Sequence, residues 1–326
     1  MEPQRPVKRP RNDEDVPQAS EAWLDDGNII IVCGTTGFRV HKSVLALNSA
    51  VFKDMLAIGD ATPDCNETFE GCVVVRLPDD AHDMVSLYAR RGSVIAFETL
   101  VSLIKLSTKY AFDELREEVV ELIRLMFPTE IEVHDKQAYL ATVPSDFDAA
   151  IAVKLGITYH IPSIVPLACY YTALQGIEEL LDGPRKTLSN GTPMVLSHVA
   201  ERTCLVFREK LARIITETLD VNKLYSNPWL GCVNCEGITD VERQAIERPY
   251  RTLDTDIFRI LPFGESSSVD ILKNLRDYIN RCGSCHGRLT DFDIEVNQQI
   301  WDRLPEACGY GDWDAVCQAQ TASSSM

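Results

Sequence analysis

The clearest apolar pattern near the start of the chain is the β-branched run at residues 29–32, which predicts a buried strand. Gly34 and Gly37 bracket two threonines and predict a hairpin turn followed by a second short strand. After His41 the apolar positions change to helical spacing, so a helix is expected there. Ser49 interrupts this helical run at a point where it could cap a second helix.

Helical spacing of apolar positions continues through most of the remaining chain. Residues 98–107 and 114–126 each place their apolar side chains on one face, and Pro128 is expected to end the second helix. Beyond it the pattern is helical throughout, with a long helix expected from about residue 193 to 219. The pattern therefore predicts the α+β class, in which an N-terminal α/β module is followed by an all-helical C-terminal region.

Seven residues around the first predicted helix follow a known motif. A phenylalanine and a His-Lys pair lead into the helix, and four further positions follow at fixed spacing: Phe38, His41, Lys42, Leu45, Ser49, Phe52 and Met55. This pattern resembles the start of a BTB/POZ domain, and the resemblance continues through residues 74–80 and 103–110. Residues 103–110 and 300–305, with Trp313, are also similar to a large BTB group of mushroom-forming fungi. The resemblance implies that the N-terminal module is a BTB/POZ domain and that the seven residues are structural.

His41 lies beside the charged Lys42, an arrangement that two different roles can explain. A histidine next to a charged group can act in catalysis. A histidine at the junction of a strand and a helix is more often a hydrogen-bonded structural residue. The BTB/POZ resemblance implies the structural role, and no catalytic residue is predicted in the chain.

The resemblance also implies a protein–protein interaction surface, because BTB/POZ domains form homodimers or contact other proteins. This surface is expected on the N-terminal strand and the first helix, with the predicted residues Trp23, Leu24, Asp25, Ile29, Val44 and Leu45. The alternative location for the apolar members is the internal core. Val44 and Leu45 are adjacent in a helix and cannot face the same direction, so at least one is expected inside. Two copies of the chain would bury the same apolar patch against each other.

Composition, helical patterning and the BTB/POZ resemblance together divide the chain into four predicted segments. Residues 1–22 are expected to be a disordered tail, 23–127 a BTB/POZ domain, 128–318 the helical region, and 319–326 a second disordered tail. The first tail contains the basic cluster Lys8-Arg9-Pro10-Arg11. This cluster is either a short nuclear import signal or one of the basic runs that occur commonly by chance.

The charge balance excludes one broad class of partner. The chain has 49 acidic and 32 basic residues and a formal net charge of −17, whereas broad nucleic-acid binding needs a basic face. No stretch of about 18 consecutive apolar residues occurs, so no transmembrane helix and no membrane partner are expected. The N-terminus also lacks the apolar core of a signal peptide, and the predicted location is cytoplasmic, nuclear or both.

Two cysteine pairs are the candidate metal ligands. Cys232 and Cys235 form one CxxC pair, and Cys282 and Cys285 form the other. The two-residue spacing lets both thiolates of a pair face one ion, and lasting disulfides are not expected in a reducing compartment. The four cysteines are therefore candidate ligands of one structural zinc, and no other cofactor is predicted. The alternative is a set of unliganded thiols, because 46 residues separate the pairs, against about 15–20 in a compact zinc ribbon.

The chain carries none of the common enzyme signatures GxxxxGK[ST], GxSxG and HExxH. We therefore predict a non-enzymatic interaction module that dimerises with itself or with another protein. One form of this function is a substrate adaptor for a cullin-type ubiquitin ligase, which many BTB proteins bind through a hydrophobic-x-Glu motif after the third helix. The nearest match, Ala96-Phe97-Glu98, has alanine at the apolar position. The alternative is a nuclear scaffold or transcription co-factor, and a zinc-stabilised enzyme is more remote.

Overall fold

The computed structural model describes residues 18–61, 67–88, 95–131, 143–181, 186–187, 191, 193–218 and 294–324. The chain divides into two compact units, residues 1–120 and residues 121–326. The basic cluster at residues 8–11 and the four cysteines of the CxxC pairs lie outside the described residues. Their proposed roles in nuclear import and zinc binding therefore stay predictions.

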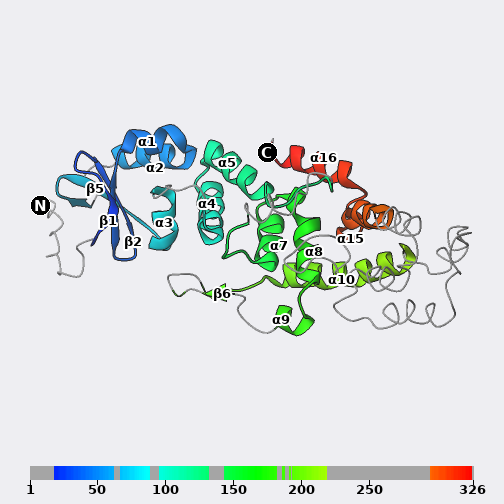
Figure 1. Ribbon diagram of the computed structural model, residues 1–326. Helices are drawn as coiled ribbons and strands as arrows, with labels where there is room; N and C mark the ends of the chain where they lie inside the picture. The colour runs from blue at the N-terminus through cyan, green and yellow to red at the C-terminus, as the bar shows by residue number, and fades with distance from the viewer. Residues whose placement is uncertain are drawn as a thin grey trace, which may run out of the picture. The chain divides into compact units, whose positions relative to one another are not determined.

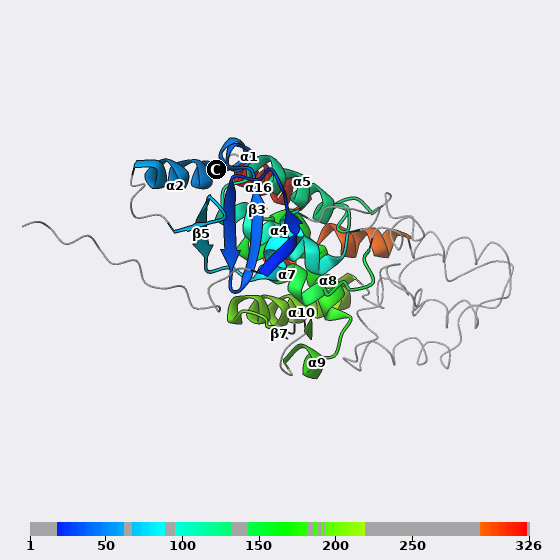
Figure 2. The same cartoon turned by 90° about the vertical axis from the view of Figure 1, so that its left-hand side faces the viewer.

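The first unit is built on a five-stranded mixed sheet with the spatial order β1-β3-β2-β5-β4 (Figure 1). The strands are β1 (Gln18–Trp23), β2 (Ile29–Cys33), β3 (Thr36–Val40), β4 (Thr68–Phe69) and β5 (Cys72–Leu77). Figure 2 looks onto the blue strands of this sheet and labels β3 and β5. β2 is antiparallel to β3 and parallel to β5, and β1 runs parallel to β3 along one edge. β1 includes residues 18–22, which were predicted to belong to a disordered tail. Their own sequence has no strand-like apolar pattern, and they form a strand by pairing with β3.

The central strand β2 is buried on both faces, as the β-branched run predicted. All five of its residues are at most 1% exposed. Ile29, Ile31 and Cys33 face the side that the helices cover, whereas Ile30 and Val32 face the opposite side. The second side is closed by a smaller group of side chains, namely Trp23, Phe69, Cys72 and Val74.

Two arginines complete the smaller face of the sheet. The strand registers place Arg39 opposite Ile30 and Arg76 opposite Val32. Their guanidinium groups reach acidic side chains near β4, Arg39 to Glu70 at 3.6 Å and Arg76 to Glu67 at 2.9 Å. Arginine stems can cover apolar surface while their charged ends stay in water. The smaller apolar face of the sheet is therefore buried at its centre and bordered by two ion pairs.

The turn between β2 and β3 is tighter than the sequence predicted. Cys33 pairs with Thr36, so only Gly34 and Thr35 form the loop, and Gly37 is already part of β3. Gly34 has a φ of 58°, in the left-handed region that favours glycine. A glycine at the first central position is typical of a two-residue hairpin turn, whose twist matches that of the flanking strands.

Among the described residues, five helices follow the hairpin: α1 (Lys42–Asn48), α2 (Ala50–Ala61), α3 (Ala81–Tyr88), α4 (Phe97–Lys109) and α5 (Asp113–Arg124). The first four contribute one apolar residue or more to the main core, including Leu45, Phe52, Met84 and Leu106. The helices predicted at 98–107 and 114–126 are confirmed as α4 and α5, with small shifts at their ends.

The second unit is mainly helical, which confirms the predicted fold class. Its described elements are α7 (Ala149–Thr158), the 3-10 turn η3 (Pro162–Ile164), α8 (Val165–Ala173), α9 (Ile177–Leu181), α10 (His198–Thr218), helical residues 294–302, α15 (Leu304–Cys308) and α16 (Trp313–Ser324). A small hairpin of β6 (Lys186–Thr187) and β7 (Pro193–Met194) departs from the all-helical prediction. The predicted long helix begins at His198 because Pro193 and Met194 pair as a strand and Ser197 accepts a hydrogen bond from the Ala200 amide at 3.3 Å.

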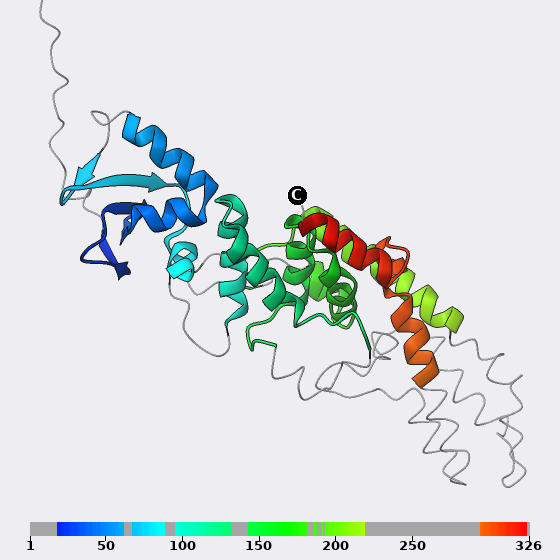
Figure 3. The same ribbon diagram turned by 90° about the horizontal axis from the view of Figure 1, so that it is seen from above.

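Two tryptophans attach the C-terminal helices to the start of the second unit. The rings of Trp301 and Trp313 stack with their centroids 5.2 Å apart. Trp301 donates its indole N–H to the Thr129 carbonyl at 3.3 Å, and Trp313 donates to the Trp301 carbonyl at 3.0 Å. Figure 3 shows α16, in red, beside the green helices of the same unit. Segments far apart in sequence are thus held together by indole stacking and two hydrogen bonds.

Ser49 joins three parts of the first unit through a single hydroxyl group. Its Oγ accepts a hydrogen bond from the Phe52 amide at 3.0 Å, which confirms the predicted cap of α2. The same hydroxyl donates to the Tyr110 carbonyl at 2.5 Å, at the end of α4. Ser49 is 1% exposed, so water cannot replace either partner.

We expect Ser49→Ala to lower the free energy of unfolding by about 2 kcal/mol, because the change removes a helix cap and leaves a buried carbonyl without its donor. The measurement is the midpoint of urea denaturation of the full chain, followed by circular dichroism. Ser43→Ala, at an exposed position of α1, is the matched control and should leave the midpoint unchanged. Equal midpoints for the two variants would contradict the role given to the Ser49 hydroxyl.

Candidate interaction surface

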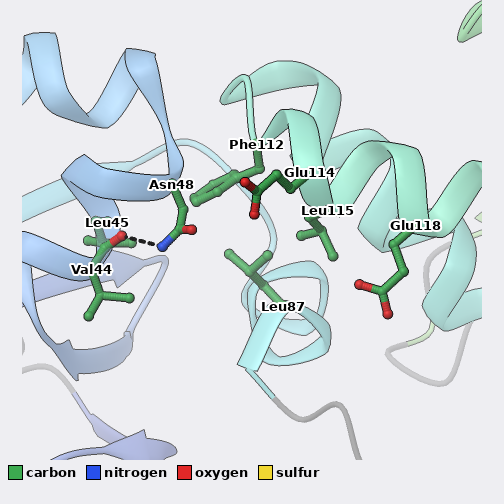
Figure 4. Close-up of a pocket in the computed structure, with 8 residues that line it drawn as sticks. All are labelled: Val44, Leu45, Asn48, Leu87, Phe112, Glu114, Leu115 and Glu118. Carbon is green, nitrogen blue, oxygen red and sulfur yellow. Dashed lines mark hydrogen bonds between the residues drawn. The ribbon is translucent and has the colours of Figure 1, made fainter. Parts of the chain in front are cut away.

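A groove of about 340 Å³ opens on the first unit between α1, α3 and the start of α5 (Figure 4). It is lined by Val44, Leu45, Asn48, Leu87, Phe112, Glu114, Leu115 and Glu118. Leu45 and Phe112 are buried members of the main core, and Leu87 and Leu115 pack against that core. The inner wall of the groove is therefore the outer surface of the core, and its shape depends on how the surrounding helices are fixed.

Buried carboxylates fix α3 against α4 on one side of the groove. Asp79, just before α3, accepts hydrogen bonds from the Lys109 ammonium at 2.6 Å and from the Tyr110 hydroxyl. One turn further on, Asp83 accepts from Ser102 at 2.6 Å and from Lys105 at 2.5 Å. Asp79 contacts Lys109, and Asp83 contacts Lys105. Two ion pairs one helical turn apart therefore hold α3 against α4.

The Tyr110 hydroxyl stays protonated in this arrangement. Burial raises its pKa well above the ordinary tyrosine range, and the Asp79 carboxylate raises it further because a phenolate there would face a second negative charge. The ring of Tyr110 also packs against Phe52, with the ring centroids 4.8 Å apart. Tyr110 thereby connects the ionic contacts of α3 to the aromatic core beneath α2.

Negative charge borders the groove on its α5 side. Glu114 and Glu118 lie one helical turn apart on α5 and both line the groove. Asp113 and Glu114 stand in the first turn of α5, where negative charge also stabilises the helix dipole. On the α1 side the rim carries an amide, because Asn48 donates to the Val44 carbonyl at 2.8 Å. The groove thus combines an apolar floor with polar and acidic edges, a composition suited to binding a protein segment.

Comparison with known protein families decides what this unit is. A family model described as the BTB/POZ domain matches residues 25–126. These residues form a BTB/POZ domain. Such domains are generally protein–protein interaction modules, often dimerising ones, rather than enzymes. No curated protein and no solved structure matches the chain.

The seven motif residues of the BTB/POZ domain occupy structural positions. Phe38, Leu45 and Phe52 are buried in the main core, Met55 packs against it, and Ser49 makes the hydrogen bonds described above. The amide of Lys42 donates to the Asn28 side chain at 2.8 Å, which satisfies the first N–H group of α1.

His41 precedes α1, where the strand β3 gives way to the helix. Its Nε2 lies 3.3 Å from an Asp26 carboxylate oxygen, and its backbone carbonyl accepts from Val44 and Leu45. These contacts place His41 at the start of the helix, where the structural role was predicted.

The predicted interaction residues fall into two groups. Leu24, Asp25 and Val44 lie at the surface, with Val44 54% exposed. Trp23 is half-buried and packs against the small face of the sheet. Ile29 and Leu45, by contrast, are 1% and 4% exposed, so their prediction as surface contacts is corrected to core. The reason is that Ile29 belongs to the buried central strand and Leu45 lies on the inward side of α1.

The sequence-based prediction missed the most exposed apolar residue of α1. Leu47 is 84% exposed and follows Val44 by three positions, so the two are neighbours on the helix surface. Large apolar side chains that stay in water next to a groove are typical of interaction sites. Once Leu45 is known to face the core, helical spacing places Val44 and Leu47 on the outer side of α1. We call Val44 and Leu47 the α1 patch.

Metal binding and membrane insertion are the two remaining predictions that concern the described residues. Within the described ranges, no group of three or more His, Cys, Asp or Glu residues is arranged to hold a metal ion. The CxxC cysteines lie outside those ranges, so the predicted zinc site stays a prediction. No helix in the described part of the chain is both long and apolar enough to cross a membrane.

We expect Asp79→Asn to lower the free energy of unfolding by about 2 kcal/mol, because the amide removes the charge that Lys109 and Tyr110 both contact. The measurement is thermal and urea denaturation of the full chain at neutral pH. Asp80→Asn is the matched control: Asp80 is exposed, and its side-chain oxygen caps the His82 amide at 2.8 Å, a contact that asparagine can also make. Comparable stability of the two variants would show that the buried carboxylate does not fix α3.

Proposed function

We propose that the chain is a non-enzymatic interaction protein that forms a homodimer through the α1 patch of its BTB/POZ domain. The observation that carries this proposal is the exposure of Val44 and Leu47, 54% and 84%, beside an apolar groove. In a symmetric dimer both copies contribute the same patch, so Val44 and Leu47 of each copy would be buried at the interface.

The energetic argument follows from the chemistry of the patch. Fully burying a valine or leucine side chain stabilises an interface by about 1.5–3 kcal/mol. Four such side chains per dimer provide a compact apolar centre, and the groove next to the patch offers space for a partner side chain. Association also costs translational and rotational freedom, so the patch alone does not fix the affinity. Leu24, which is 43% exposed, is a second apolar residue available at the surface.

Two narrower functions, a cullin adaptor and a nuclear scaffold, stay predictions from sequence. In the segment nearest the cullin motif, Phe97 is 1% exposed and the Glu98 carboxylate lies 2.8 Å from His82 Nε2. Both side chains are therefore engaged within the domain, which does not favour their use as a cullin contact. The similarity to the fungal BTB group likewise rests on the sequence motifs, and a pulldown with a cullin separates the adaptor from the scaffold.

The proposal is tested by native mass spectrometry and sedimentation of the full chain. The native sequence should give a dimer, and Val44→Glu with Leu47→Glu, which changes four side chains per dimer, should weaken it by at least about 3 kcal/mol, or more than a hundredfold in Kd. The control is Ile58→Glu, compared with each single variant Val44→Glu and Leu47→Glu, because it adds one glutamate at a residue of α2 that is 69% exposed and outside the α1 patch.

Each outcome has a defined meaning. A native monomer at all concentrations would overturn the homodimer. A dimer that persists in the double variant would move the interface away from the α1 patch. Equal weakening by Ile58→Glu would show that added charge, and not loss of the patch, separates the copies. Circular dichroism of each variant confirms that the fold is retained.

A further inference from the structure

Three cysteines that are distant in sequence meet inside the second unit. Cys169 lies on α8, Cys204 on α10, and Cys308 is the last residue of α15. The thiol of Cys169 is in hydrogen-bonding contact with the thiols of both Cys204 and Cys308. Cys169 is therefore the central member of the group, and none of the three forms a disulfide. We call these residues the thiol cluster.

Accessibility falls from one end of the thiol cluster to the other. Cys308 is partly exposed, whereas Cys204 is 2% exposed and Cys169 is fully buried. Gly309, with a φ of 92°, ends α15 immediately after Cys308 and keeps this cysteine at the end of the helix. Cys308 is therefore the member of the thiol cluster nearest to solvent, and Cys169 and Cys204 are shielded from a solution oxidant.

Cys169 is held as a neutral thiol in the resting protein. Burial raises its pKa well above the ordinary cysteine value, and hydrogen bonds with Cys204 and Cys308 raise it further. A buried neutral thiol is inert toward a solution oxidant, since the thiolate is the nucleophile. Attack on an oxidised neighbouring sulfur also proceeds through the thiolate, so the raised pKa slows this step, whereas the contact between the two sulfurs favours it through a high effective concentration.

We propose that the thiol cluster is an oxidation site. A peroxide oxidises Cys308, and the oxidised Cys308 then forms a disulfide with Cys169. In the first step the Cys308 sulfur attacks one peroxide oxygen. An S–O bond forms, the O–O bond breaks, and the leaving oxygen takes up the Cys308 thiol proton and departs as water or an alcohol, which gives a sulfenic acid. In the second step the Cys169 sulfur attacks the Cys308 sulfur, and the sulfenic hydroxyl leaves as water with the Cys169 proton. Two thiols are oxidised and one peroxide is reduced.

The third thiol allows the disulfide to move inward. Cys204 can attack the Cys169 sulfur of the first disulfide, forming the Cys169–Cys204 bond and releasing Cys308 as a thiol that takes the Cys204 proton. This exchange needs no further oxidant. The product links α8 to α10 in a region that a reductant cannot reach directly. Sulfurs already in contact need only a short approach to the S–S bond length of about 2.05 Å.

The test uses the full reduced chain, treated with a molar excess of hydrogen peroxide and then blocked with an alkylating reagent. Peptide mapping by mass spectrometry should find a disulfide of Cys169 with Cys308 or Cys204, and its yield should increase with time. Cys308→Ser should abolish that disulfide. The matched control is Cys317→Ser, which removes an exposed thiol of the neighbouring helix α16 and should leave the yield unchanged.

The results that would overturn the proposal are equally specific. Oxidation confined to Cys317 and other residues, with Cys169 still free, would show that the cluster is ordinary core packing. A Cys169–Cys204 disulfide that forms at the same rate in Cys308→Ser would remove Cys308 as the reacting thiol. Mapping of the native chain decides the first point without any variant, and Cys308→Ala replaces Cys308→Ser if the serine variant does not fold. Neither result depends on dimer formation by the BTB/POZ domain.

Discussion

The BTB/POZ domain depends above all on the burial of β2 from both sides of the sheet. A strand whose five residues are at most 1% exposed must have a complete layer of side chains on each face. The helices supply one layer, and Trp23, Phe69 and neighbouring residues supply the other. A one-residue slip of β2 would exchange these two faces, so the short turn at Gly34 and the pairing with β5 must fix its register.

The exposed α1 patch follows from the same constraint. Because β2 requires a helical layer, α1 must turn Leu45 inward, and the periodicity of the helix then leaves Val44 and Leu47 in water. Ser49 ends α1, caps α2 and contacts the end of α4 through one hydroxyl. The groove lies where α1, α3 and the start of α5 leave part of the core surface uncovered. Exposure of the α1 patch is in this sense a consequence of how the core is closed.

Local patterns in the sequence were sufficient to predict β2, the cap at Ser49 and the helices α4 and α5, because each is determined by residues close in the chain. β1 was missed because Gln18–Trp23 has little apolar periodicity and becomes a strand only by pairing with β3. The choice between core and surface for Val44 and Leu45 needed the orientation of α1 against the sheet, whereas Ile29 lies in the run that was already predicted to be a buried strand. Cys169 and Cys204 looked isolated for the same reason: only the packing of α8, α10 and α15 brings them to Cys308.

The second unit already holds the thiol cluster in a defined arrangement before any covalent bond forms. Trp301, before α15, contacts Thr129, and Trp313, after α15, contacts Trp301. Gln320 on α16 accepts a hydrogen bond from the buried Ser163 hydroxyl at 2.9 Å. A disulfide at Cys169 would therefore join helices that are neighbours in the reduced protein. Such a bond acts mainly by restricting the unfolded chain and leaves the folded arrangement in place. Oxidation of the cluster should accordingly raise the free energy of unfolding of the helical unit and leave its folded surface largely unchanged.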